Sequence, residues 1–269
     1  MTTTHKSLGY FGSAYDSPEA YEVTTRYAIF ASPRTGSDYV CARLANFQDM
    51  LGIPMEYLHQ DAVAEISARA PQPPAVVPGT TGSVSVSEYM ELLEGLRATP
   101  DGYFGLKAQP AQLLALAEGK FDQVVEFLRE FDKLILMYRK DKVAQAVSGA
   151  IAQTTGRWVN FGEEIELTRQ HGKMLFPLMA EFLAAFLKED AFVTAVAEAL
   201  ADRPLLIVYH ESLIDDPDAV VRRVVSFLKP GQDTLPPEHD LLPVTARPAG
   251  QTSAQFRADF LAHIANSAA

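Results

Sequence analysis

The sequence predicts an α/β fold in which a parallel sheet carries helices on both faces. Four apolar runs of strand length alternate along the chain with segments whose apolar residues recur at helical spacing. Strands separated by helices form βαβ units, and these units build a parallel sheet. The chain has 269 residues, of which 48% are hydrophobic and 21% charged, so it can bury a sizeable core. We expect a single domain over residues 1–269, with a loosely ordered arm over residues 1–20.

The first expected strand spans residues 27–32 and ends in a turn that contains Pro33 and Gly36. A helix is expected to follow from Ser37, because apolar residues after it share one face at steps of three and four: Val40, Leu44, Phe47 and Leu51. Residues 71–83 are rich in Pro, Gly, Ser and Thr, which predicts a surface loop and not a domain boundary.

The remaining elements continue the alternation of helix and strand. In chain order we expect a helix from Ser87, a strand at 103–107, a helix at 109–118, a strand at 133–138, a helix at 141–153, two helices within 163–200, a strand at 204–209, a helix at 217–228, a loop at 230–251 and a closing helix from about Ser253. Ligands of parallel sheets bind beyond the carboxyl ends of the strands. The residues that follow each strand are therefore the candidates for a functional site.

The composition argues against several classes of protein. The net charge is −11, from 34 acidic and 23 basic residues, so the surface repels phosphate backbones and no nucleic-acid partner is expected. The one cysteine, Cys41, cannot form an intramolecular disulfide or a four-cysteine zinc site, and the histidine spacing indicates no metal site. No apolar run reaches about 18 residues, and residues 1–17 lack the apolar core of a signal peptide. We therefore expect no membrane span and a cytoplasmic location.

The turn after the first strand is the first candidate site. It consists of Ser32, Pro33, Arg34, Thr35, Gly36 and Ser37. Such a strand, Gly-containing turn and helix start are P-loop-like, because backbone N–H groups and the helix dipole together attract an anion. Arg34 adds a planar guanidinium, and Thr35 and Ser37 add hydroxyl groups. The full Walker pattern is absent, since no lysine precedes Ser37. An ordinary βα turn is the alternative that this motif leaves open.

A cluster of cations after the third strand is the second candidate site. Arg139, Lys140 and Lys142 lie within four residues in a chain that is strongly acidic overall. If Arg139 ends the strand, Ser148 lies on the following helix, and both can converge on one anion. The alternative is a solvated helix start. Cations there oppose the helix dipole, however, and this mild misfit favours a function.

The two candidate sites together resemble the nucleotide-binding elements of sulfotransferases that use 3′-phosphoadenosine 5′-phosphosulfate (PAPS). The bacterial trehalose 2-sulfotransferase family, with its nodulation-factor relatives, is the branch that the sequence is most similar to. Further matches follow in the same order from about residue 27 to residue 257: G-I-P-M-E-Y at 52–57, F-G-L-K at 104–107, Q-T-T-G-R-W at 153–158, Y-H-E-S-L-I-D-D-P at 209–217 and R-P-A-G-Q-T-S at 247–253. The resemblance implies the sulfotransferase fold over nearly the whole chain.

The resemblance also implies how the nucleotide is bound. The loop of residues 32–37, with Arg34, would bind the 5′-phosphosulfate group, and Arg139 and Ser148 would hold the 3′-phosphate. Two further residues in matching segments are expected at the nucleotide: Trp158 and Arg247. For Trp158, stacking on the adenine and plain packing both stay open. Pro33 departs from some relatives, because it removes one N–H group from the loop.

The catalytic roles implied by the resemblance fall on Arg34, Lys107 and Glu56. Lys107 matches a lysine near the sulfuryl group, where it would stabilise charge on the bridging oxygen, and Glu56 matches a carboxylate near the acceptor hydroxyl. Ile53 stands where the trehalose enzymes have a second glutamate, so the assignment of the base stays open. His59 is the rival base, since its usual pKa suits neutral pH and a helix would place it on one face with Glu56.

The expected function is transfer of a sulfuryl group from PAPS to a hydroxyl group of a small, carbohydrate-like acceptor. The family chemistry needs no metal, and its members form dimers, so a homodimer is expected. Two alternatives remain from the sequence. One is a small-molecule or nucleotide kinase of P-loop type, and the other is a non-catalytic protein that binds adenosine bisphosphate.

Overall fold

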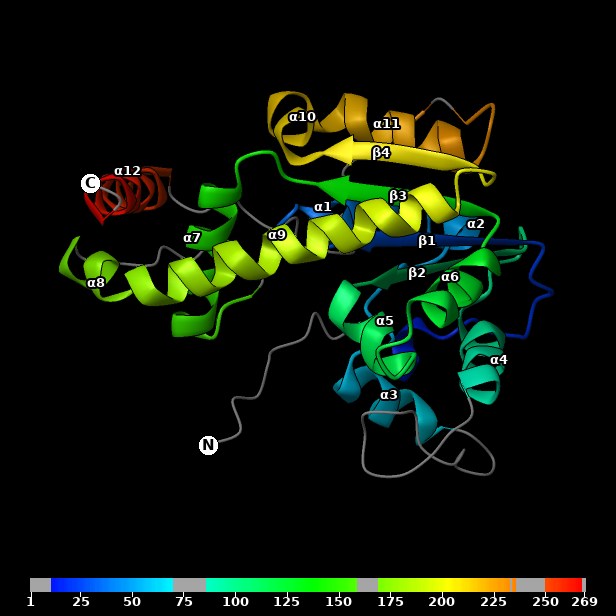
Figure 1. Ribbon diagram of the computed structural model, residues 1–269. Helices are drawn as coiled ribbons and strands as arrows, with labels where there is room; N and C mark the ends of the chain where they lie inside the picture. The colour runs from blue at the N-terminus through cyan, green and yellow to red at the C-terminus, as the bar shows by residue number, and fades with distance from the viewer. Residues whose placement is uncertain (1–10, 70–85, 159–168, 233, 236–249, 268–269) are drawn as a thin grey trace.

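The computed structural model of the chain describes residues 11–69, 86–158, 169–232, 234–235 and 250–267. Four strands pair in parallel in the order β2-β1-β3-β4, and helices cover both faces of the sheet (Figure 1). The strands are β1 (Thr25–Ala31), β2 (Tyr103–Ala108), β3 (Lys133–Tyr138) and β4 (Leu205–Tyr209). The expected α/β class is confirmed, and each of the four expected strands forms.

The helices account for most of the remaining described chain. In the first half they are the short 3-10 helix η1 (Ser13–Tyr15), α1 (Ser37–Ala45), α2 (Gln48–Leu51), α3 (Gln60–Ser67), α4 (Val86–Arg97), α5 (Pro110–Leu116) and α6 (Phe121–Arg129). In the second half they are α7 (Lys142–Thr155), α8 (Arg169–Met174), α9 (Phe176–Ala199), α10 (His210–Asp215), α11 (Pro217–Leu228) and α12 (Gly250–Ser267). Within the described ranges, no helix combines the length and the apolar character needed to cross a membrane.

The helix expected from Ser37 onward is divided in the structure into α1 and α2. Asn46 and Phe47 each donate a backbone hydrogen bond to the carbonyl three residues earlier, at 3.3 Å and 2.8 Å. These shorter-range bonds tighten the chain and end α1. Helices α3, α6 and α10 were not expected. Helix α10 buries one side chain, so its sequence carries little periodicity to detect. In α6 the apolar residues do recur at helical spacing, at Phe121, Val124, Val125 and Leu128, so that helix carried a usable signal.

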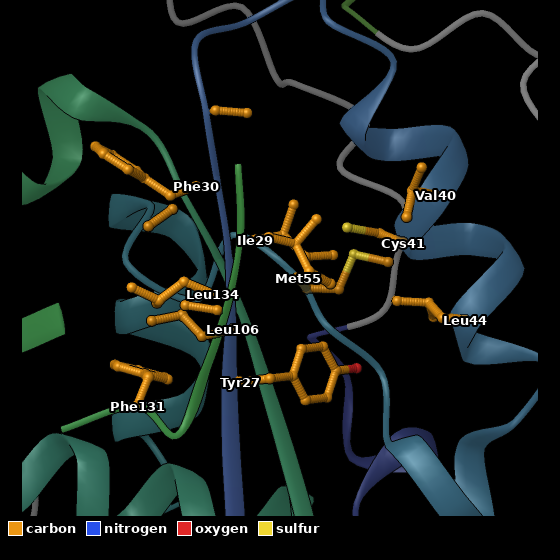
Figure 2. Close-up of a cluster of buried hydrophobic side chains, with 14 of the residues drawn as sticks. Tyr27, Ile29, Phe30, Val40, Cys41, Leu44, Met55, Leu106, Phe131 and Leu134 are labelled. Atoms are coloured by element: carbon orange, nitrogen blue, oxygen red, sulfur yellow. The ribbon is translucent and has the colours of Figure 1, made fainter. Parts of the chain in front are cut away.

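The main core lies on both faces of β1, the central strand between β2 and β3. Figure 2 shows Tyr27 and Ile29 pointing toward Cys41 and Leu44 of α1, whereas Phe30 points to the opposite face. On that opposite face the Phe30 ring packs edge-on against a phenylalanine of α9, with ring centroids 6.3 Å apart. β1 is therefore buried on both sides, as expected for a continuous apolar run in a parallel sheet.

A second cluster of buried apolar side chains joins α7, α9 and α12 beyond the carboxyl ends of the strands (Figure 1). It consists of Val147, Ala150, Met179, Phe256 and Phe260. Arg257 on α12 also donates from Nε to Oδ2 of Asp141, at the start of α7, over 2.7 Å. These contacts fix α7, the helix that carries Ser148, at the edge of the sheet where ligands of α/β folds bind.

The segment before β1 contacts the domain from Phe11 onward. The Phe11 ring is buried against Tyr57, with ring centroids 6.1 Å apart. Arg97 on α4 donates to the Phe11 carbonyl at 3.0 Å and pairs with Asp16 at 3.1 Å. In the arm expected over residues 1–20, Phe11 and Asp16 therefore contact the domain, and residues 1–10 lie outside the described residues.

Candidate active site

The loop after β1 has the left-handed backbone that a tight turn into a helix requires. Arg34 has a φ of 67° and Gly36 a φ of 87°, and α1 begins at the next residue. A Cβ atom on Gly36 would lie 2.7 Å from the Leu213 side chain of α10. Glycine is therefore needed here both for its φ angle and for space. A positive φ is uncommon for arginine, and such strain is concentrated at functional sites.

A network of buried polar side chains on α7 and α9 supports the start of the loop. Ser32 is fully buried and donates from Oγ to Oδ1 of Asp190 on α9 at 3.0 Å. Gln145 on α7 is also fully buried and donates to Ser32 Oγ at 3.1 Å and to the Pro33 carbonyl at 2.7 Å. Lys142 completes the network, because its ammonium contacts both Gln145 Oε1, at 2.7 Å, and the Asp190 carboxylate. The start of the loop is thus held by both α7 and α9.

The end of the loop is held by the hydroxyl group of Thr35 and by His210. Thr35 is buried and donates from Oγ1 to the Ser32 carbonyl at 3.0 Å. His210 Nδ1 lies 3.2 Å from the Thr35 carbonyl. Burial and the nearby Arg139 guanidinium lower the pKa of His210 to about 4, so the ring is neutral at pH 7 and its Nδ1–H can donate. Ser37, the first residue of α1, is also buried.

Arg34 and Ser148, which the sequence assigned to different phosphate groups, are in contact. Arg34 Nε donates to Ser148 Oγ at 3.0 Å, and its Nη1 donates to the Trp158 carbonyl. Burial lowers the pKa of Arg34, and the Asp38 carboxylate opposes that shift. The guanidinium therefore reaches from the loop after β1 to the helix after β3.

Arg139 approaches the same loop from the end of β3. Its Nη1 donates to the Arg34 carbonyl at 3.3 Å. Its Nε is buried and has no hydrogen-bond partner among the described residues. Burial lowers the pKa of Arg139, with nearby carboxylates acting in the opposite direction. A buried guanidinium N–H with no partner is costly, so this group is suited to binding an anion that enters the site.

Lys107 is the second cationic centre and lies between two carboxylates. Its side chain is only 3% exposed, and its ammonium contacts Asp38 on α1 and lies 2.6 Å from Oε1 of Glu56. Burial disfavours the charged ammonium, but Asp38 and Glu56 outweigh this effect and raise the pKa of Lys107 well above its usual value. The ion pair forms because β2 lies beside β1, with Ile29 opposite Lys107 in the sheet.

Glu56 is held in place by its backbone and by two glutamines. The residue before it, Met55, makes an isolated parallel bridge to β2, and the Lys107 N–H donates to the Met55 carbonyl at 2.9 Å. Gln109 Nε2 donates to Glu56 Oε1 at 2.6 Å, and Gln112 Nε2 donates to Oε2 at 3.1 Å. A carboxylate offers about four lone-pair positions, and three donors therefore occupy three of those on Glu56.

His59 does not share a helix face with Glu56, contrary to the conditional expectation. The chain makes a turn in which the His59 N–H donates to the Glu56 carbonyl at 2.9 Å, and α3 begins only after His59. His59 Nδ1 faces Asp61, 3.4 Å from its backbone nitrogen and 3.7 Å from its carboxylate. The Glu56 carboxylate turns instead toward Lys107. The two candidate bases are thus oriented by different partners.

Trp158 and Arg247 complete the set of residues expected from the sequence. The Trp158 ring packs edge-on against Phe182 of α9, with ring centroids 6.4 Å apart, while its carbonyl accepts from Arg34. Arg247 lies outside the described residues. In the described ranges, no group of three or more His, Cys, Asp or Glu side chains is arranged to hold a metal ion.

Several polar residues of the site were missed by the sequence analysis: Asp38, Gln109, Gln112, Gln145 and Asp190. Gln109 and Gln112 carried a usable signal, because they follow Lys107 closely at the start of a helix. Asp190 carried none, since its contact with Ser32 joins residues 158 positions apart. Together the site brings two arginines, a lysine and a carboxylate to the carboxyl edge of a parallel sheet, which suits transfer of an anionic group to an acceptor that must lose a proton.

Comparisons with known proteins identify a family that matches this chain. The model of a family described as Stf0 sulphotransferase matches residues 26–262. A solved sulfotransferase from Alicyclobacillus acidocaldarius is similar in fold, with a TM-score of 0.50 and 16% identity over 90% of this chain and 94% of that chain. The sulfotransferase STF9 from Mycobacterium avium has a TM-score of 0.43 and 13% identity over 92% of this chain and 69% of that chain. The comparison with curated proteins gives no significant match.

Proposed function

This chain belongs to the Stf0 sulphotransferase family, and we propose that it transfers a sulfuryl group from PAPS to a hydroxyl group of a small, carbohydrate-like acceptor. The family match spans most of the chain and makes the protein a sulfotransferase. The identity of the donor, the chemical class of the acceptor and the roles of single residues are the parts that we add here.

The contact between Arg34 and Ser148 is the observation that carries the choice of donor. PAPS has two anionic groups, a 5′-phosphosulfate and a 3′-phosphate. The resemblance assigns the first group to the loop of residues 32–37 and the second to Arg139 and Ser148. Arg34 joins the two sets, because its side chain donates to Ser148 at 3.0 Å and its carbonyl accepts from Arg139 at 3.3 Å. One compact cationic site could then hold both anions of a single nucleotide.

The proposed reaction uses Glu56, Lys107 and Arg34. The acceptor oxygen forms a bond to sulfur while the bond between sulfur and the bridging phosphate oxygen breaks, so that adenosine 3′,5′-bisphosphate (PAP) leaves. The hydroxyl proton goes to Glu56, and Lys107 and Arg34 offset the charge that develops on the bridging oxygen. The 22% exposure of the Glu56 side chain supports access by a small acceptor.

Two further parts of the proposal concern the state of the protein in the cell. We propose a homodimer, as the resemblance implies, and a cytoplasmic location, as expected from the sequence. The mass of the purified protein in solution, measured by light scattering after gel filtration, tests the first part. Fractionation of the source cells tests the second part.

A comparison of nucleotides tests the donor directly. PAP should raise the melting temperature clearly more than 5′-AMP does, because only PAP carries the 3′-phosphate. A ligand at about 100 times its Kd adds roughly 2.7 kcal/mol to the free energy of unfolding, which a melting scan resolves. Arg139→Ala should remove most of the difference between PAP and 5′-AMP. Arg222→Ala, an exposed arginine on α11, is the matched control and should keep the difference.

The same comparison separates the alternatives. Equal shifts with PAP and 5′-AMP in the natural chain would overturn the donor assignment. A larger shift with ATP and Mg²⁺, together with turnover that EDTA abolishes and Mg²⁺ restores, would identify a kinase instead. A chain that binds PAP selectively but fails to transfer sulfuryl to any of a panel of sugars would be a non-catalytic binding protein.

A further inference from the structure

We propose that Asp38 is a positioning residue for Lys107, which holds the lysine ammonium beside Glu56 until the donor binds and then yields it to the donor. This inference rests on the proposed function, because it assumes that an anionic phosphosulfate group enters at the start of α1. Asp38 has no part in the nucleotide and acceptor roles described above. Its carboxylate nevertheless contacts the ammonium of Lys107, the cation closest to Glu56.

The ammonium of Lys107 is shared by two carboxylates from different parts of the chain. Glu56 lies 2.6 Å away, and Asp38 makes a direct hydrogen-bonded ion pair with it. The lysine side chain is 3% exposed, whereas the Asp38 side chain is 34% exposed. A ligand that enters from solvent therefore meets Asp38 before it meets the ammonium. With the Arg34 guanidinium, which also acts on Asp38, two cations face two carboxylates, so this part of the site has no surplus positive charge before an anion binds.

The position of Asp38 in α1 puts its charge where an anion would bind. It is the second residue of the helix, in the first turn, whose backbone N–H groups have no partner within the helix. A carboxylate at this point gains from the helix dipole and so occupies the same favourable potential that a phosphate group would use. Burial disfavours the ionised carboxylate, but Lys107 and Arg34 more than offset it and lower the pKa of Asp38, so the group is charged at pH 7.

Asp38 and the phosphosulfate group therefore compete for the same cation and the same helix end. Donor binding would draw the Lys107 ammonium away from both carboxylates. Glu56 Oε1 would then keep only its hydrogen bond from Gln109, at 2.6 Å, and gain a free lone pair for the acceptor hydroxyl. Donor binding thus adds a free acceptor position on Oε1 to the one that Oε2 already has, and it removes the cation that competes with the acceptor hydroxyl for Oε1.

The experiment measures nucleotide affinity by titration calorimetry with three probes: PAP, 5′-AMP and 3′-AMP. Asp38→Asn removes the competing charge but keeps the shape of the side chain. Its affinity for PAP and for 5′-AMP should rise roughly tenfold, because both place a 5′-phosphate at the start of α1. Its affinity for 3′-AMP, which lacks that phosphate, should change less than twofold. Asp38→Glu retains the charge and should bind all three nucleotides as the natural chain does.

A second acidic residue serves as a matched control. Asp218 also pairs with a cation of α1, since its carboxylate lies 2.8 Å from Arg43, but it has no contact with Lys107 or Glu56 in the structure. Asp218→Asn changes the net charge of the protein by the same amount and should leave all three affinities unchanged. A general effect of net charge would appear in both variants.

The outcomes separate this inference from the proposed function. If the natural chain does not prefer PAP to 5′-AMP, the proposed donor is wrong. If it does prefer PAP but Asp38→Asn binds PAP equally or more weakly, the role given to Asp38 is wrong. An equal gain for 3′-AMP would also overturn that role, because it would show a general change of the site. Should Asp38→Asn fail to fold, Asp38→Ser makes the same charge change and answers the same question.

Discussion

Replacement of Gln145 by methionine should destabilise the protein and weaken nucleotide binding together. Gln145 is fully buried between the loop after β1 and α7, and it makes three hydrogen bonds there. Its amide donates to Ser32 Oγ at 3.1 Å and to the Pro33 carbonyl at 2.7 Å, and its Oε1 accepts from Lys142 at 2.7 Å. Methionine keeps the length of the side chain but removes every one of these polar contacts.

The expected loss follows from the three contacts. Each of the two neutral hydrogen bonds contributes about 1 kcal/mol, and the bond from the Lys142 ammonium about 1.5–3 kcal/mol. Lys142 keeps its ion pair with Asp190, and the methionine side chain regains part of the loss by apolar burial. We therefore expect the free energy of unfolding to fall by about 2–3 kcal/mol. The loop would also lose its support, so PAP affinity should fall by roughly tenfold.

Urea denaturation followed by circular dichroism measures the first effect, and calorimetric titration with PAP measures the second. Gln255→Met provides the control, because Gln255 is exposed on α12 and its one side-chain hydrogen bond among the described residues is to the nearby Asp259, at 3.0 Å. That variant should stay within about 0.5 kcal/mol of the natural chain. A loss below about 1 kcal/mol in Gln145→Met, or equal losses in both variants, would refute the account of the buried network.

Three other predictions follow from the site. Arg34→Lys should keep the fold but weaken sulfuryl transfer by tenfold or more, since lysine cannot reach Ser148 and the Trp158 carbonyl with one planar group; steady-state rates test this. Glu56→Gln should lower turnover by roughly 10²-fold and keep PAP affinity, whereas His59→Asn should stay near normal; the reverse pattern would make the histidine the base. For His210, the lowered pKa means that the unfolded chain takes up a proton at a higher pH than the folded chain does. Stability should therefore fall as the pH drops from about 6.5 to about 4, and His210→Gln should flatten that slope in urea titrations.

The elements that the sequence predicted well are those that depend on neighbouring residues. The strand, the Gly-containing turn and the helix start around Gly36 were visible because they are contiguous, and the spacing of Arg139 and Ser148 spans a single strand–helix unit. The contact of Lys107 with Asp38 was not visible, because it depends on the order of the strands. Only when β2 lies beside β1 does Lys107 face the start of α1.

Two segments differ from the helices expected from the sequence, and each difference has a local physical cause. The helix expected after Ser37 ends early because Asn46 and Phe47 bond to carbonyls three residues back. The segment from Glu56 to His59, for which a helix was considered, is a turn, because Met55 bridges to β2 and the His59 N–H then donates to the Glu56 carbonyl before α3 begins. Both depend on backbone hydrogen bonds that side-chain periodicity does not report.

The loop after β1 has a consequence for the order in which the protein matures during synthesis. Its supports are Gln145, Asp190, His210 and the Leu213 side chain packed on Gly36, all more than 100 positions later in the chain. A ribosome adds about 5–20 residues each second, so the loop leaves the exit tunnel many seconds before its last support does. A nascent chain that stops before α10 would carry the complete Ser32–Ser37 motif and still lack the contacts of the loop with His210 and Leu213. We therefore expect the loop to reach its final form only after α10 has been synthesised.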